Sequence, residues 1–267
     1  MNKKRIKTAI ALLVAVLCIG FGVFTASPAL SSAYFTDNEW TTNKYTFGNV
    51  KIDGTERNWD PEIAKHMIPN QVVDKDPRIE NVGTNKAVGF IILDSPIVRN
   101  VSIADDSGSV REGRNVEHRK FLDSLKKEGF NTSNWTLMEN YFIDKDGKNV
   151  GNASGLKSDN LGELPEGAVA RRYVFGYKNN IAGGTESNPT KSDPLFNYIQ
   201  SQNFLDKTFG SETEYTIKVY FLGIQAENLT LDNGVKTTNE NTTNMDLDML
   251  SRIFKLIGKE IDLSKIK

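Results

Sequence analysis

Cysteine and histidine are almost missing from this chain, which has one cysteine and two histidines among its 267 residues. Cys18 lies in an N-terminal run that we expect to be removed, so the secreted chain would hold no disulfide and no catalytic thiol. His66 and His118 stand far apart, and neither belongs to an HExxH motif. A zinc peptidase needs about three protein ligands around its metal. The sequence therefore predicts no metal site at these histidines.

An excess of charge of either sign is also missing, since the formal net charge is −1. Nucleic acids and anionic lipids attract strongly basic proteins, so the composition favours neither as a partner. The chain has no G-x-S-x-G nucleophile motif either. From these absences we expect no catalytic residues, no cofactor and no nucleic-acid partner, and we expect that the protein is not an enzyme.

Charged residues are absent from Thr8 to Thr36, directly after a cationic start at Lys3 to Lys7. The run is apolar at first and ends in small residues, with Ser31 and Ala33 in the small-x-small positions that precede cleavage. This pattern predicts a signal peptide over residues 1–33, cut by a signal peptidase between Ala33 and Tyr34, and a protein secreted to the extracellular matrix or the cell surface. The alternative is an uncleaved membrane anchor, because the apolar run is long enough to span a bilayer.

The remaining chain has the alternation of apolar and polar residues that is typical of β-strands. Ala87 to Leu93 is apolar on both faces, which predicts a central strand covered on both sides. Near Gly48 the alternation shifts by one residue, which predicts a bulge or kink there. Other strands are predicted by three alternating sets, namely Tyr45, Phe47, Val50 and Ile52; Tyr173, Phe175 and Tyr177; and Tyr215, Ile217, Val219 and Phe221.

Helical spacing is scarce and occurs in two places. Glu117 to Lys127 is predicted as a short helix that ends at Gly129, and Asp246 to Lys259 as a longer one. The polar segment Asp232 to Asn244 reads as a linker before a loosely attached tail. We therefore predict an all-β, jelly-roll-like β-sandwich over residues 34–235, with a few short helices, followed by a polar linker and a helical tail over residues 236–267.

Two polar segments and one aromatic strip have an alternative functional interpretation. The oxygen-rich residues from Asp144 to Asn149, and those after Asp105, are spaced unlike an EF-hand and are better interpreted as turns than as calcium loops. The alternating aromatic residues of the strand around Phe175 would suit a ligand-binding strip, but core packing is the more common role of such residues.

Three blocks of the sequence resemble the TasA/camelysin family, whose members are exported through the SipW-type signal peptidase. The matching residues are Ala33, Tyr34, Phe35, Asn43, Phe47 and Gly48 in the first block; Pro69, Val73, Asn81, Gly83 and Val88 in the second; and Leu195, Phe196, Ile224 and Gln225 in the third. Asn70 stands where the family has the glycine of a Pro-Gly pair, and asparagine tolerates the positive φ that such a turn can require.

The resemblance implies a secreted jelly-roll sandwich, and for TasA-like members a subunit of extracellular fibres in a biofilm matrix or on the cell surface. Its partners would be further copies of itself, head to tail, and other matrix or cell-wall components. The alternative that the same family suggests is a camelysin-type secreted or surface metallopeptidase.

The segment that follows the predicted cleavage point is the candidate assembly element. It extends from Tyr34 to Phe47 and carries few apolar side chains among many polar ones, so it is not expected to order alone. We expect it to add as a donor strand to a sheet edge of the next subunit. The residues predicted to act there are Tyr34, Phe35, Trp40, Tyr45, Phe47 and Gly48. The alternative is that the segment folds back as the first strand of its own sandwich.

Overall fold

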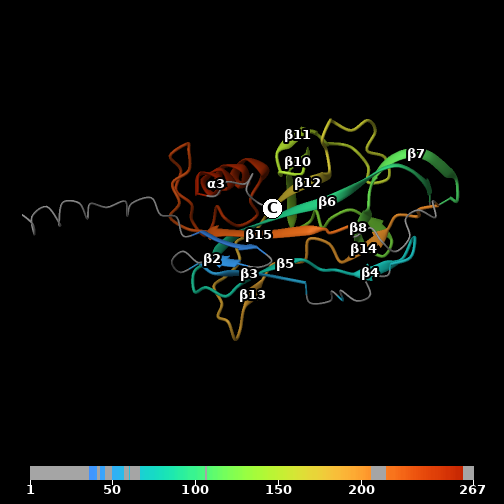
Figure 1. Cartoon of the computed structure of the whole chain (residues 1–267). Coiled ribbons are helices and arrows are strands. Elements are labelled where there is room, and N and C mark those ends of the chain that lie inside the picture. Colours follow the sequence, from blue (N-terminus) through green and yellow to red (C-terminus); the bar gives the residue numbers. More distant parts are fainter. Residues whose placement is uncertain are drawn as a thin grey trace, which may run out of the picture. The chain divides into compact units, whose positions relative to one another are not determined.

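The computed structural model describes residues 36–40, 43–45, 50–56, 60, 67–105, 107–205 and 215–260, with the backbone alone at 36–40, 43–45 and 259–260. These residues belong to one unit, Phe35–Lys267, and form three antiparallel sheets and a C-terminal helix (Figure 1). The prediction of a mostly β fold is therefore confirmed. No helix within the described residues is long and apolar enough to cross a bilayer.

The largest sheet has eight strands in the order β11-β10-β12-β6-β15-β1-β2, with β7 paired to the far half of β6. Its members are β1 (Thr36–Trp40), β2 (Asn43–Tyr45), β6 (Ala87–Ala104), β7 (Val110–Glu117), β10 (Trp135–Ile143), β11 (Asn149–Asn152), β12 (Ala170–Tyr177) and β15 (Lys218–Gln225). Strands distant in sequence thus lie side by side, with β6 between β12 and β15.

Two smaller sheets complete the β structure. One is β13 (Thr190–Lys191), β5 (Arg78–Asn81) and β3 (Ile52–Thr55), and the other is β4 (Val72–Asp74), β14 (Tyr198–Ser201), β8 (Arg119–Ser124) and β9 (Lys127–Glu128). Ile52, Ile79, Phe121 and Ile199 from these sheets share one apolar cluster with Phe175 and other residues of the large sheet. Burial of these side chains holds both small sheets against one face of the large sheet.

The middle of the large sheet confirms the predicted central strand. Residues 87–93 of β6 are buried on both faces, with Ile91 and Leu93 in the cluster shared with the small sheets. On the opposite face, the ring of Phe90 lies 5.1 Å from that of Phe254 in the helix α3 (Leu247–Glu260). A strand covered on both sides has no polar face, which explains its continuous apolar sequence.

The predicted helix at Glu117 to Lys127 is wrong. These residues form the end of β7, then β8, a turn and β9. β8 pairs with β14 from Tyr198↔Leu122 to Ser201↔Arg119, and Leu125 is 65% exposed at the turn. Phe121 and Leu122 are consecutive, so they suit opposite faces of a strand as well as one side of a helix. Pairing with a strand far along the chain decided between the two.

The C-terminal helix is confirmed, but its loose attachment is not. α3 buries one face completely, since Leu250, Ile253 and Ile257 are 0% exposed. Asp246 begins it as an N-cap, because its Oδ1 accepts a hydrogen bond of 2.8 Å from the backbone N–H of Met249. The tail therefore packs on the face of the large sheet that lies opposite the two small sheets.

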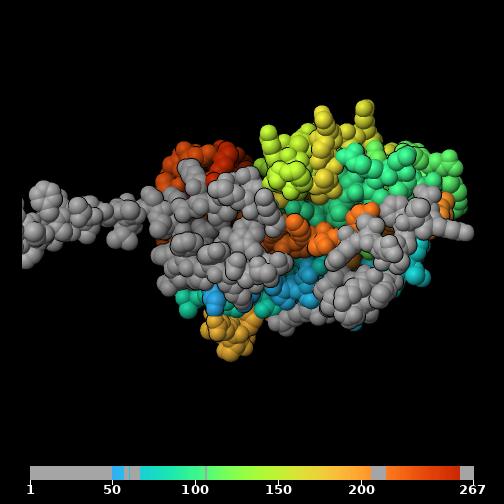
Figure 2. Space-filling view, in the orientation of Figure 1, coloured from blue at the N-terminus to red at the C-terminus, as the bar shows by residue number. Residues whose placement is uncertain are grey.

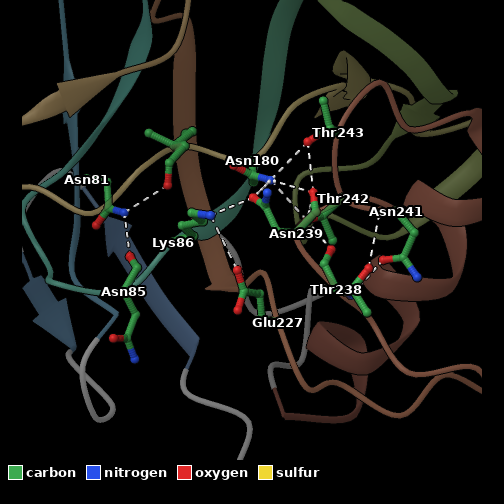
Figure 3. Close-up of polar contacts among 11 residues, drawn as sticks. Asn81, Asn85, Lys86, Asn180, Glu227, Thr238, Asn239, Asn241, Thr242 and Thr243 are labelled. Atoms are coloured by element: carbon green, nitrogen blue, oxygen red, sulfur yellow. Dashed lines mark hydrogen bonds and ion pairs between the residues drawn. The ribbon is translucent and has the colours of Figure 1, made fainter.

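The polar segment before α3 is held by hydrogen bonds and does not behave as a free linker (Figure 3). The side-chain amide of Asn180 contacts Asn239, Thr242 and Thr243 at 3.0–3.3 Å, and Lys86 Nζ donates to Asn239 Oδ1 at 2.5 Å. Thr242 is 0% exposed. Asparagine and threonine are frequent in loops because their side chains replace backbone partners, which explains why so polar a segment is ordered here.

Candidate functional site

The candidate site is the edge of β15 along which the predicted assembly segment lies. Of the residues predicted to act in assembly, Trp40 ends β1 and Tyr45 ends β2. The described residues do not include the other four, which are Tyr34, Phe35, Phe47 and Gly48. They also do not include the predicted cleavage point between Ala33 and Tyr34. The predicted bulge near Gly48 is outside them too.

β1 pairs with β15 of its own chain in an antiparallel register that runs from Thr36↔Ile224 to Glu39↔Phe221. β2 then pairs with β1 and places Asn43 opposite Trp40. Within a single chain the segment thus takes the alternative arrangement, as the strand next to β15. Backbone hydrogen bonds hold such a pair and do not depend on side-chain identity.

Both faces of β15 are buried and its other edge is paired. The edge that β1 occupies therefore also requires a partner. Val219 and Phe221 face the cluster shared with the small sheets, while Leu222 and Ile224 are 0% exposed and point to the opposite face. β6 pairs along the other edge from Lys218↔Asp94 to Gln225↔Ala87. Without β1, the backbone N–H and C=O groups of a buried strand would lack partners, which is costly.

Two glycines allow the face of β15 to approach β3 closely. A Cβ on Gly223 would lie 2.7 Å from Ile52 Cγ2, and a Cβ on Gly54 would overlap the ring of Phe221. Figure 2 shows orange residues of the 215–225 segment between the blue of the β3 region and the yellow-green of the strands after β9. The small sheet therefore fixes β15 in place on the side opposite α3.

The end of β15 at which β1 begins is bordered by the polar loop described above (Figure 3). Lys86 precedes β6 and forms an ion pair of 3.4 Å with Glu227, two residues after β15. The backbone N–H of Ala226 donates to the carbonyl of Lys86 at 2.8 Å. Because Thr36 pairs with Ile224, the assembly segment enters the sheet beside this fixed end.

The second histidine is packed in the core and does not face a cleft. His118 is 8% exposed, and its ring lies 4.0 Å from that of Tyr215 in a stacked arrangement. Burial, together with the positive charge of Arg119, lowers the pKa of His118 to about 3. His66 lies outside the described residues. Among the residues that the structure describes, no three or more His, Cys, Asp or Glu side chains gather to hold a metal ion.

The predicted turns are confirmed. Asp144 Oδ1 accepts backbone hydrogen bonds from Asp146 and Lys148 at 2.9 and 3.0 Å and closes the hairpin between β10 and β11. Asp105 does the same for Ser107 and Ser109 between β6 and β7. Asn70 has a φ of 65°, so the asparagine adopts the backbone conformation expected for it.

The alternating aromatics of β12 belong to the core, as expected, since Tyr173, Phe175 and Tyr177 are all in the main cluster. The two arginines beside them were not predicted to have a role. Arg171 donates to Glu117 at 2.8 Å, and Arg172 makes bonds of 2.6 and 2.7 Å to the two oxygens of Asp94. The sequence did carry a signal for these ion pairs, namely two adjacent arginines within an apolar strand. Such a strand is expected to be buried, and buried charges must be paired.

The chain matches no protein-family model, and no curated protein or solved structure matches it. Its function is therefore inferred from the geometry of the β15 edge and from the pattern of the sequence.

Proposed function

We propose that this protein is a secreted structural subunit of extracellular fibres, and that subunits join when the β1 segment of one copy occupies the β15 edge of the next. The observation that carries the proposal is the β1–β15 pair. It joins a polar N-terminal segment to a strand that is buried on both faces and paired along its other edge. A strand of this kind binds whichever copy supplies the missing partner.

Exchange of β1 between copies would produce a polymer and not a closed pair. Each chain carries one donor segment and one β15 edge, and in this proposal each copy donates to the next and not back to its own donor. The contact is then head to tail, and a contact that does not close on itself grows a filament. The same hydrogen bonds form in the monomer and in the filament. Release of the segment from a membrane-held leader, by cleavage after Ala33, would start the exchange.

The type of sandwich and the location of the protein belong to this proposal as well. The three antiparallel sheets and their shared core support a jelly-roll sandwich, the fold that the resemblance to the TasA/camelysin family implies. In this proposal the protein acts by assembly and has no catalytic centre. Its place is the biofilm matrix or the cell surface, with other matrix or cell-wall components as further partners.

The test compares the chain that begins at Tyr34 with one that begins at Asn43 and so lacks β1. Electron microscopy should show filaments of the longer chain, whereas the shorter chain should form none. A synthetic peptide of residues 34–42 should bind the shorter chain and raise its melting temperature, because it restores partners to β15. A peptide with the same residues in scrambled order serves as the control. Filaments from the shorter chain, or none from the longer one, would contradict the proposal.

A further inference from the structure

A cleft of about 720 Å³ lies on the other side of β6 from the β15 edge. It is lined by residues of β8 and β9 from the four-stranded sheet and of β10 and β12 from the large sheet. The apolar side chains on its wall are Phe121, Phe130, Leu137, Leu156 and Tyr173. This volume is typical of sites for small molecules, which measure about 300–1,000 Å³.

The floor of the cleft is a buried polar network built on Arg171, which is 3% exposed. Its Nη1 donates to Glu117 Oε1 at 2.8 Å, and its Nη2 donates to the carbonyls of Ala153 and Leu156 at 3.0 Å. The hydroxyl of Tyr173 donates to the same Glu117 oxygen at 2.5 Å. The network holds the guanidinium rigidly and neutralises its charge.

Asn140 presents an unused donor to this cleft. It is 8% exposed, it lines the cleft, and its Oδ1 accepts a hydrogen bond of 2.8 Å from Arg171 Nε. Because Nε–H can only donate, this bond fixes the orientation of the amide, and Nδ2 must point away from Arg171. Nδ2 has no hydrogen-bond partner among the described residues. Nδ2 is not among the atoms that are closed off from solvent, so it can donate to a molecule that enters the cleft.

The charges of the cleft balance, which favours an uncharged ligand. Asp105 pairs with Arg111 at 2.9 Å, and Glu117 pairs with Arg171. The lining also carries two lysines, Lys120 and Lys157, and two acidic residues, Glu128 and Asp159. The exposed carboxylate of Glu128 accepts a hydrogen bond from Ser158 and has further capacity to accept from hydroxyl groups.

We propose that this cleft binds a neutral oligosaccharide. A sugar ring has apolar C–H faces that suit the Phe130 and Leu137 side of the wall. Its ring and hydroxyl oxygens can accept from Asn140 Nδ2, and its hydroxyls can donate to Glu128. The site is independent of the β15 edge and would give the protein a ligand whether or not it polymerises.

The experiment is calorimetric titration of the secreted chain with cellohexaose, chitohexaose and maltohexaose. At least one should bind saturably at one site per chain. Asn140→Asp keeps an oxygen for Arg171 but removes the donor, and it should weaken binding by about tenfold. Asn233→Asp, in an exposed turn where the carboxylate can still accept from Val235, is the matched control.

A second variant avoids the buried network. Leu137 is 40% exposed and lines the cleft, so Leu137→Ala should weaken binding several-fold without unfolding the chain. Leu125→Ala, at a site 65% exposed and off the lining, should have no effect. The proposal is overturned if none of the three oligosaccharides binds or if both cleft variants bind as the unaltered chain does. Salt-sensitive binding of polygalacturonate in preference to all three would overturn it as well.

Discussion

Phe221 of β15 lies directly against the backbone of Gly54 in β3, so that a Cβ on Gly54 would be 1.9 Å from Phe221 Cδ2. The ring fills the space that any other residue would need for its side chain. This contact joins the three-stranded sheet to the strand that carries the proposed assembly edge, and it explains why a glycine stands within a strand.

Gly54→Ala is therefore expected to destabilise the protein by about 1–3 kcal/mol, since the added methyl group must displace a packed ring. Urea denaturation followed by fluorescence measures the change. Gly258→Ala is the control, because Gly258 is an exposed position of α3 and a Cβ added there would have nothing within 4 Å. That change should stabilise the helix by up to about 1 kcal/mol. Equal effects of the two substitutions would contradict the close contact.

Cysteines at positions 38 and 222 should report which chain supplies β1 to β15. Asn38 and Leu222 are Cα partners in the antiparallel register, a geometry close enough for a disulfide. In the chain that begins at Tyr34, oxidised monomers should contain an internal bond, and oxidised filaments should give covalent ladders on non-reducing gels. Pairing position 38 with position 220 is the control, because diagonal positions are about 7–8 Å apart. Internal bonds alone in filaments would argue against strand exchange.

Removal of the Phe254 ring should show that the C-terminal helix is part of the core. Phe254 is 6% exposed and packs on Phe90 at 5.1 Å, so Phe254→Ala should cost about 3–5 kcal/mol in unfolding free energy. Lys255→Ala changes the next, exposed residue and should cost less than about 1 kcal/mol. If thermal unfolding of Phe254→Ala matched that of the unaltered chain, the helix would be a loose tail after all.

The buried pair of Glu117 and Arg171 should be far more important for stability than an exposed pair. Side-chain exposure is 0% for Glu117 and 4% for Arg171. Glu117→Gln leaves the guanidinium without its counter-charge and should cost about 3–5 kcal/mol. Asp146→Asn breaks a pair whose side chains are 80% and 57% exposed and should cost about 0–1 kcal/mol. Chemical denaturation of both variants side by side decides the point.

His118 should make the folded state less stable as the pH falls. Its pKa is lowered to about 3 by burial and by Arg119, whereas an unfolded histidine titrates near 6.5. The unfolded chain therefore binds more protons between these values. Stability should fall on acidification below pH 6.5, by at most about 1.4 kcal/mol per pH unit.

Denaturation midpoints at pH 7.0, 6.0 and 5.5 measure this slope before most carboxylates titrate. His118→Gln should reduce the slope, because glutamine does not titrate. His66→Gln provides the matched control and should leave the contribution of His118 in place. A slope that is the same with and without His118 would show that this ring is not held neutral.

Local sequence patterns were sufficient where one strand or helix buries a regular face. Ala87 to Leu93 is apolar at every position because it is covered on both sides, and α3 was predicted from its helical spacing. The turns at Asp105 and Asp144 follow from side chains that bond to their own backbone a few residues away. Each of these features depends on residues close together in the chain.

The rest was decided by contacts between distant segments. Phe121 and Leu122 join a strand and not a helix because β14, far along the chain, pairs with them. Arg171 has a counter-charge because β7 brings Glu117 to it. Lys86 and Asn180, which are distant in sequence, bind the polar segment at Asn239. Hydrogen bonds and ion pairs between distant segments follow no regular spacing along the chain. The sequence by itself therefore determined the β class and the final helix, whereas tertiary packing decided the β15 edge and the cleft.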